Sequence, residues 1–236
     1  MNHVVMRIGA LGDIHGAFDA AQTIMKRHAD VPLWVCVGDV ASNEGGYFEP
    51  VAPLYWIKGN NEDFDVVAAA VAGRQLFPTL HYLPNGGPHR VGTWRVAALG
   101  GTFAPSWYNT PAAQLPPSRG RRASSGPLKL GKSRDDKRRH FVREEVIACK
   151  GLTNIDLLLT HEAPRPFYPA GRRLDAGKTV LNEVLAVMKP RLHLFGHHHE
   201  FTDSVRQGVR SIGLDIVTSS YLLIDAETFK TERLET

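Results

Sequence analysis

The chain has 236 residues, of which 43% are hydrophobic and 22% are charged, and its formal net charge is +4 at pH 7. This balance is ordinary for a globular protein, so it excludes a fibrous repeat and a chain that is disordered throughout. A membrane-spanning helix needs about 20 apolar residues in a row. The longest apolar run here, residues 66–72, is far shorter, and we therefore expect a soluble protein.

The N-terminal segment and the two cysteines indicate the compartment. Residues 1–7 lead directly into a strand-like segment and lack the pattern of a signal peptide. Two cysteines, Cys36 and Cys149, are too few for a disulfide framework and favour a reducing compartment. Cys36 lies inside an apolar run, so we expect it to be a small core residue. These features predict a cytoplasmic protein without disulfides.

Short apolar runs that end in Gly, Asn, Asp or His recur along the chain. They predict strands at residues 4–10, 33–37, 54–58, 155–159 and 191–195. Runs of this kind, apolar at nearly every position, are typical of strands that are buried on both faces. Helical periodicity between them predicts helices at residues 17–28, 62–72, 135–150 and 175–188. Strands that alternate with helices indicate an α/β fold.

Two regions depart from this alternation. Residues 81–101 contain Pro-Asn-Gly-Gly followed by a strand-like run, which predicts a hairpin. The C-terminal part predicts strands joined by short turns at residues 201–205, 211–217 and 221–225. Together the elements predict one domain over residues 1–236, with a core of two sheets and helices on the outside.

A basic insertion at about residues 104–134 interrupts the pattern, because it is rich in Pro, Ser and Gly and lacks apolar periodicity. Ten Lys and Arg between residues 118 and 143 face only two Asp, so this stretch carries +8 and the rest of the chain −4. Such an arm would attract a polyphosphodiester. The expected substrate contacts are Arg119, Arg121, Arg122 and Trp107, whose ring could stack on a base. The alternatives are a surface insertion without function and aromatic rings that anchor the loop.

Oxygen and imidazole donors follow five of the predicted strands, at the point where each strand ends. The carboxyl ends of strands in open α/β sheets are where ligands bind. Asp-x-His and His-x-His pairs place both side chains on one side, because strand residues i and i+2 share a face. The candidates, all of types that bind divalent first-row metals, are Asp13, His15, Asp39, Asn60, His161, His197 and His199. They are enough for two ions that share one carboxylate.

Each candidate has a simpler interpretation when it is considered alone. Asp13 would cap the following helix, and Asp39 and Asn60 would be turn residues. A single His161 at a strand end would be a packed or solvated histidine. The order of these residues after five core strands favours a metal site over chance.

The motifs are Gly12-Asp13-Ile14-His15, Gly38-Asp39, Gly59-Asn60-Asn61-Glu62, Thr160-His161 and Gly196-His197-His198-His199. This ordered series resembles the calcineurin-like metallophosphoesterase superfamily. The resemblance implies an α/β fold, a four-layer αββα sandwich of two mixed β-sheets flanked by helices, with a binuclear metal centre. It implies one ion held by Asp13, His15, Asp39 and His199, and a second held by Asp39, Asn60, His161 and His197. A looser similarity to RNA lariat debranching enzymes rests on residues 81–83, 96–101 and 158–165.

One position departs from the superfamily pattern. The motif usually continues from Gly-Asn to a His, which is thought to stabilise the transition state or protonate the leaving oxygen, and Asn61 stands there. An amide donates a hydrogen bond to a phosphoryl oxygen but transfers no proton at neutral pH. The catalytic candidates are therefore Asn61, His198 as a proton donor, and Arg165, which could only stabilise charge. Otherwise the activity is slow, or the role is partly binding.

The expected function is metal-dependent hydrolysis of phosphodiester bonds in nucleic acid or nucleotides, similar to RNA debranching. Two cations (Mn, Fe or Zn) would clamp the reacting oxygens, with a metal-bridging hydroxide as nucleophile. His193 would orient a metal ligand or be a packed strand histidine. The alternatives are a phosphomonoesterase for small molecules or phosphoproteins and a weakly active, metal-bound scaffold for RNA or protein. No helix-turn-helix or zinc-finger spacing supports a DNA-binding module.

Overall fold

The computed structural model describes residues 6–118 and 135–236, which form two six-stranded sheets and a small two-stranded pair. The first sheet has the order β14-β13-β1-β2-β3-β4. Its strands are β1 (Arg7–Leu11), β2 (Trp34–Cys36), β3 (Leu54–Trp56), β4 (Leu80–Tyr82), β13 (Ser220–Asp225) and β14 (Thr231–Glu235). Strands β1 to β4 are parallel, and β13 and β14 are added in antiparallel fashion beside β1.

The second sheet has the order β11-β12-β10-β9-β6-β5. Its strands are β5 (Gly86–Val91), β6 (Trp94–Leu99), β9 (Leu157–Thr160), β10 (Leu192–Phe195), β11 (Thr202–Arg206) and β12 (Val209–Gly213). The four central strands are parallel, and β5 and β11 are antiparallel edges. The separate pair joins β7 (Thr102–Phe103) to β8 (His140–Phe141).

The two sheets pack face to face, and alternation along their strands decides which residues fill the core. Ile8, Val35, Leu159 and Leu194 lie in the cluster between the sheets and are fully buried. Burying an aliphatic side chain of this size contributes about 1.5–3 kcal/mol each. The neighbouring residues in the same strands face the helices instead, which is why the strands are apolar at nearly every position.

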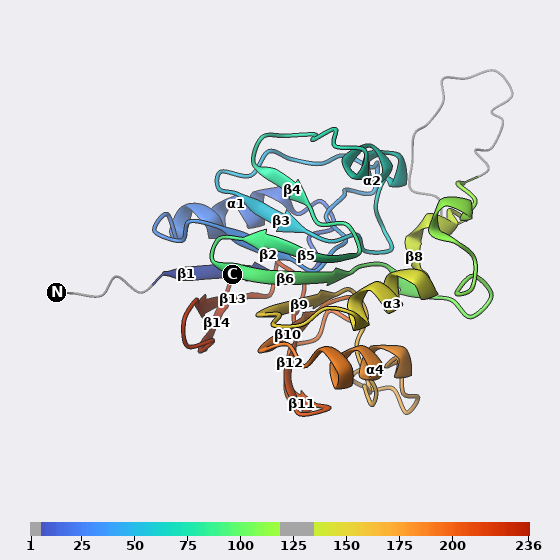
Figure 1. The fold of residues 1–236 in the computed structure, drawn as a ribbon. Coiled ribbons are helices and arrows are strands. Elements are labelled where there is room, and N and C mark those ends of the chain that lie inside the picture. Colours follow the sequence, from blue (N-terminus) through green and yellow to red (C-terminus); the bar gives the residue numbers. More distant parts are fainter. Residues whose placement is uncertain (1–5, 119–134) are drawn as a thin grey trace, which may run out of the picture.

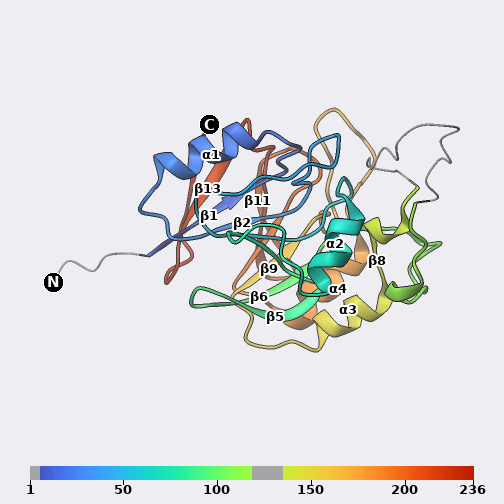
Figure 2. The same cartoon turned by 90° about the horizontal axis from the view of Figure 1, so that it is seen from above.

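Helices cover both outer faces, as Figures 1 and 2 show. Helices α1 (Phe18–Arg27) and α2 (Phe64–Val71) pack on the first sheet, in one cluster with residues of β1, β2 and β3. Helices α3 (Arg143–Lys150) and α4 (Thr179–Met188) pack on the second sheet, against β6 and β9. The layers are therefore helix, sheet, sheet and helix, which confirms the predicted αββα sandwich.

The helix predicted at residues 135–150 is wrong in its first half. A 3₁₀ turn (Lys137–Arg139) and β8 come first, and α3 begins only at Arg143. The buried Lys58 ammonium donates hydrogen bonds to the carbonyls of Arg138 and His140, both at 3.0 Å. Those carbonyls are then unavailable to a helix, because an α-helix needs each one for the amide four residues on.

Three further boundaries differ from the prediction. Residues 80–82 form β4 in the first sheet, so the hairpin is limited to β5 and β6. The strand predicted at residues 211–217 is β12, which ends at Gly213, and β14 was not predicted at all. Helix α4 begins four residues later than predicted because the Asp175 carboxylate holds the preceding loop: it accepts hydrogen bonds from the Phe167 and Gly177 amides.

Cys36 and Cys149 are both free and buried, which confirms the core position predicted for Cys36. Among the helices that the structure describes, none is long and apolar enough to span a bilayer.

Candidate metal centre

The predicted ligands meet at one edge of the sandwich, because the carboxyl ends of its parallel strands converge there. Asp13 and His15 follow β1, Asp39 follows β2, and Asn60 follows β3. His161 follows β9, and His197 and His199 follow β10. Both sheets therefore contribute side chains to a single site.

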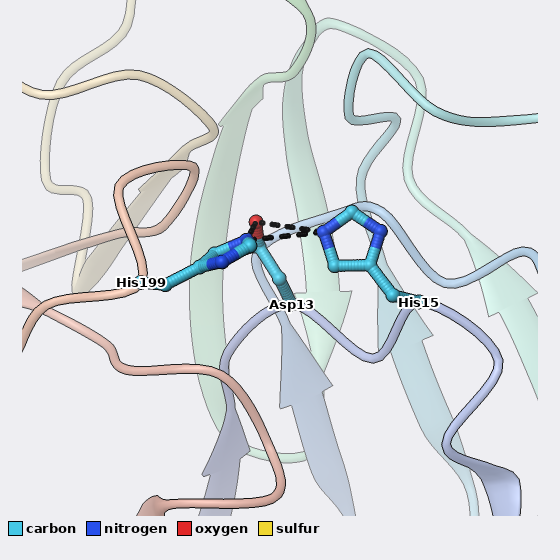
Figure 3. A group of neighbouring side chains, drawn as sticks. All are labelled: Asp13, His15 and His199. Atoms are coloured by element: carbon cyan, nitrogen blue, oxygen red, sulfur yellow. Dashed lines mark hydrogen bonds and ion pairs between the residues drawn. The ribbon is translucent and has the colours of Figure 1, made fainter.

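A first group of side chains surrounds the Asp13 carboxylate (Figure 3). His199 Nε2 lies 3.0 Å from Asp13 Oδ2 and 3.0 Å from His15 Nε2. His15 Nε2 also lies 3.5 Å from Asp39 Oδ2. Two imidazole nitrogens and two carboxylate oxygens thus converge on a common point.

A second group lies on the other side of Asp39. His161 Nε2 is 3.1 Å from Asn60 Oδ1, 3.2 Å from His197 Nδ1 and 3.6 Å from Asp39 Oδ2. Ligand atoms bound at about 2.1 Å to one divalent ion lie about 3.0–3.4 Å from one another. The spacing fits an ion in each group, and Asp39 belongs to both.

The hydrogen bonds of His161 supply an independent test of whether a cation fits. Its Nδ1–H donates to the carbonyl of Val37 at 2.8 Å, so in the neutral ring Nε2 is the atom with the lone pair. That lone pair faces the carbonyl oxygen of Asn60, so two electron-pair donors point at each other. A metal ion between them removes this repulsion, so the donor set fits the group that the motifs imply.

Charge in the centre also favours cations. Burial alone would raise the pKa of Asp39, but the charges of His161 and His15 and two hydrogen bonds from Asn61 outweigh it and lower that pKa. Burial alone would lower the pKa of His161, but the nearby carboxylates of Asp39 and Asp13 outweigh burial and raise that pKa. Burial, together with the charge of His161, lowers the pKa of His197 to about 3. Asp39 is therefore an anion and His197 a neutral donor at neutral pH.

Four of the seven predicted ligands have left-handed backbone conformations, which non-glycine residues seldom adopt. The φ angles of His15, Asp39, His197 and His199 are 48°, 52°, 71° and 52°. Each costs about 1–3 kcal/mol, and such strain concentrates at functional sites. Asp and His enter this region more readily than most residues, but residue type alone does not place them there.

Two motif glycines make room for the carboxylates. A Cβ at Gly59 would collide with the carboxylate of Asp39, and one at Gly196 would collide with that of Asp13. The glycines are therefore required by the close approach of backbone to ligand.

Glu62 is a residue whose role the sequence did not indicate, although it ends one of the motifs. Its buried carboxylate accepts hydrogen bonds from the amides of Val40, Ala41 and Gly59 at 3.0, 3.2 and 3.2 Å, and from the Tyr47 hydroxyl at 2.9 Å. Burial and the charge of Asp39 raise the pKa of Glu62 to about 7. This one side chain therefore ties the loop that carries Asp39 to the loop after β3.

Replacing Glu62 with Ala should loosen both loops. Three buried amides lose their acceptor, at about 1–3 kcal/mol each, so the free energy of unfolding should fall by about 3 kcal/mol or more. Metal affinity should fall about 10–100-fold, as it does when groups that orient ligands are removed. Urea unfolding and metal titration measure the two effects. Glu49→Ala, which removes an exposed carboxylate, is the control and should change neither.

The structure places Asn61 against the shared carboxylate. Its backbone amide donates to Asp39 Oδ1 at 2.7 Å, and its side-chain Nδ2 donates to Asp39 Oδ2 at 2.9 Å. One N–H of the side-chain amide is used in this way, and the other is left for a second acceptor. Asn61 therefore orients Asp39 and lies beside both groups of ligands.

The other two catalytic candidates lie in different surroundings. The His198 ring stacks on Phe167 at 4.5 Å, and no described residue offers its buried Nε2 a hydrogen bond. Burial and the charge of Lys178 lower the pKa of His198 to about 4, so the ring is neutral at neutral pH. Arg165 is half exposed and pairs with Asp175, its Nε lying 2.7 Å from the carboxylate.

Of the substrate contacts predicted for the basic insertion, only Trp107 lies within the part of the chain that the structure describes. It is partly buried, with the Lys137 ammonium 5.9 Å from the centre of its ring. Its neighbours Phe103 and Tyr108 pack on the cluster that covers the second sheet. Arg119, Arg121 and Arg122 lie outside the described residues.

His193 is fully buried in β10. Its Nε2 lies 2.8 Å from the Thr160 hydroxyl and its Nδ1 lies 3.0 Å from the Ser211 hydroxyl, and Thr160 also donates to the carbonyl of Glu162. It contacts the segment next to His161, as a packed strand residue would. Burial lowers the pKa of His193 to about 3.

This pKa makes stability depend on pH. Burial favours the neutral ring in the folded protein, so the unfolded chain takes up a proton at His193 more readily than the folded protein does. The unfolding free energy is therefore fully retained above the unfolded pKa of 6.5 and falls as the pH drops from there toward 3. Between pH 7 and pH 5 the wild type should lose about 2 kcal/mol more unfolding free energy than His193→Asn, in which this titration is absent. Urea unfolding at both pH values measures the difference, and parallel losses in the two proteins would contradict the assignment.

Comparison with known proteins agrees with the geometry. The sequence profile of the calcineurin-like phosphoesterase superfamily domain matches residues 6–214. Among solved structures, TT1561 of Thermus thermophilus superposes with a TM-score of 0.65 at 13% identity, covering 98% of this chain and 99% of that one. A putative 5'-nucleotidase from Staphylococcus aureus gives a TM-score of 0.50 at 11% identity, covering 98% of this chain and 54% of that one.

An archaeal phosphodiesterase gives a TM-score of 0.45 at 12% identity, covering 98% of this chain and 100% of that one. At sequence identities this low, structural similarity shows only that the fold is shared. No curated protein matches the sequence. The family uses divalent metals, and Asp13, His15, Asp39, His161 and His199 form candidate metal-binding groups here. The profile match over most of the chain, together with the αββα fold, establishes that this chain belongs to the calcineurin-like phosphoesterase superfamily.

Proposed function

We propose that the protein is a phosphodiesterase with two divalent metal ions, acting on nucleotides or nucleic acid. The observation that carries the proposal is the convergence of the seven ligand-type side chains in two groups that share Asp39. Mn, Fe and Zn all suit histidine and carboxylate ligands. Both cysteines are free thiols, which supports a cytoplasmic location.

Each side chain has a defined part in this proposal. Asp13, His15 and His199 would hold one ion with Asp39, and Asn60, His161 and His197 would hold the other. When bound, the ions supply Lewis acidity, which lowers the pKa of water to near 7 and offsets the charge of the phosphoryl oxygens. Val37, through its carbonyl, and Asn61 orient His161 and Asp39.

Asn61 also shapes the choice of substrate. Its remaining side-chain N–H can donate to a phosphoryl oxygen, which stabilises negative charge there. It cannot protonate the leaving oxygen, and the neutral His198 ring is enclosed against Phe167. Without a proton from these residues, the leaving group departs as an anion or takes its proton from water, so the weakly acidic leaving groups of nucleic acid should react more slowly than p-nitrophenolate.

The test compares two chromogenic esters with the metal-loaded chain. We expect kcat/KM to be higher for bis-p-nitrophenyl phosphate, a diester, than for p-nitrophenyl phosphate, a monoester. Chelation should abolish both rates, and added Mn²⁺ should restore them. A preference for the monoester would favour a phosphomonoesterase. No turnover of either ester with the ions bound would favour a binding scaffold, the alternative that Asn61 supports.

A further inference from the structure

A cavity of about 600 Å³ adjoins the candidate metal centre. The cavity is lined by His197, His198 and His199 and by a wall from the loop between β9 and α4, residues 163–178, which contributes Arg172 and Lys178. Small-molecule sites typically have volumes of about 300–1,000 Å³. The cavity can therefore hold a part of the substrate that extends beyond the reacting ester.

The loop that forms this wall is held in place by two carboxylates. Asp175 Oδ1 accepts hydrogen bonds from the amides of Phe167 and Gly177, both at 2.8 Å, while its Oδ2 pairs with Arg165. Glu200, next to His199, accepts a hydrogen bond from the Ala170 amide at 2.8 Å. The wall is thus anchored both within the loop and to the segment that carries the metal ligands.

Lys178 is one of the residues that line the cavity, and its ammonium contacts two oxygen atoms of the protein. Its Nζ donates to the carbonyl of Ala176 at 2.9 Å and lies 3.3 Å from the buried carboxylate of Glu162. An ammonium has three donors, and two of them are accounted for by these partners. The side chain is 26% exposed, so it is accessible from the cavity.

The charges of the loop favour an anion. Residues 163–178 contain Arg165, Arg172, Arg173 and Lys178 against a single acid, Asp175, which Arg165 neutralises. Two cations, Arg172 and Lys178, and one carboxylate, Glu200, line the cavity. Lys178 is already paired with the buried Glu162, so the Arg172 guanidinium is the main positive charge that a ligand would meet. Guanidinium and ammonium groups together are the usual partners of phosphate.

We propose that this cavity is a subsite for a second phosphate group of the substrate, bound by Arg172 and Lys178 beside the ester that is hydrolysed. The inference rests on the proposed phosphodiesterase function and deepens it. The substrate is then a molecule with two neighbouring phosphates, either a small nucleoside bisphosphate ester or a polynucleotide. The loop after β9 then selects this substrate.

The experiment uses the metal-loaded full chain and two esters that differ by one phosphate: thymidine 5'-(p-nitrophenyl phosphate) and its 3'-phosphorylated derivative. We expect KM to be at least about tenfold lower for the derivative, since a charge-assisted hydrogen bond is worth about a factor of ten or more. Arg172→Ala should remove this advantage and leave kcat for the first ester unchanged. Arg173→Ala, an exposed neighbour outside the cavity, should keep it.

Lys178 needs a second design, because its removal alone would leave the buried Glu162 without its partner. Lys178→Met combined with Glu162→Gln is compared with Glu162→Gln alone. Loss of the KM advantage only in the double variant supports the subsite. An advantage that persists in both Arg172→Ala and the double variant overturns it.

The remaining outcomes separate this inference from the function on which it rests. Turnover of both esters with equal KM in the wild type overturns the subsite but leaves the phosphodiesterase intact. No turnover of either ester overturns both. Inhibition by thymidine 3',5'-bisphosphate and by a decathymidylate identifies the source: tighter inhibition by the oligonucleotide indicates a polymer, and equal inhibition indicates a small molecule.

Discussion

Asp39→Ala should abolish hydrolysis of bis-p-nitrophenyl phosphate, with a loss of at least about 10³-fold in kcat, because ion-based charge stabilisation is worth several kcal/mol. Asp39 Oδ2 lies 3.5 Å from His15 Nε2 and 3.6 Å from His161 Nε2, so its carboxylate lies between the two groups. Its removal should lower the metal content from two ions per chain to one or none. His161→Ala should have a comparable effect on turnover.

Two controls make this result specific. Circular dichroism and thermal unfolding should show that the variants remain folded, since the core between the sheets contains neither residue. Asp19→Ala, which removes an exposed carboxylate at the start of α1, should retain full activity and metal content. Unchanged turnover in both Asp39→Ala and His161→Ala would refute the two-metal centre.

Asn61→His should increase activity in a way that depends on the leaving group. Position 61 lies directly against Asp39, and an imidazole there could protonate the departing oxygen, which an amide cannot do. For a dinucleotide, whose leaving alcohol is weakly acidic, we expect kcat to rise by about 10²-fold, the lower range of general acid catalysis. For a p-nitrophenyl ester the rise should be small, because p-nitrophenolate departs without a proton.

The measurement is kcat for both substrates in wild type and variant at equal metal occupancy. Asn61→Gln is the matched control, since it retains an amide and should give no gain on either substrate. An equal change on both substrates would contradict a missing proton donor. No gain on the dinucleotide would mean that the proton comes from elsewhere.

The arrangement of the ligands followed from the sequence because it depends on strand ends. Apolar runs located the strands, and parallel strands bring their carboxyl ends to one edge. Asp13 and His161, which lie 148 positions apart in the chain, therefore meet in the same centre. Strands that are apolar on both faces, such as β9, likewise predicted sheets covered by helices, and the family resemblance added the αββα order.

Other parts of the site depend on contacts that residue types do not encode. The left-handed backbone at His15, Asp39, His197 and His199 is set by the surrounding structure. Lys58, in the loop after β3, binds the carbonyls of Arg138 and His140 from far away in the chain and so keeps residues 138–140 out of a helix. Arg172 and Lys178 lie in no motif, and only the folded loop brings them beside His197.

Anomalous diffraction from crystals grown with Mn²⁺ would show whether side chains from both sheets bind two ions that share Asp39. The account predicts two anomalous peaks about 3.5–4 Å apart, the separation typical of two-metal sites. One peak should lie among Asp13, His15 and His199, and the other among Asn60, His161 and His197. Crystals of the Mn²⁺-saturated protein with no peak beside Asp39 would contradict the claim.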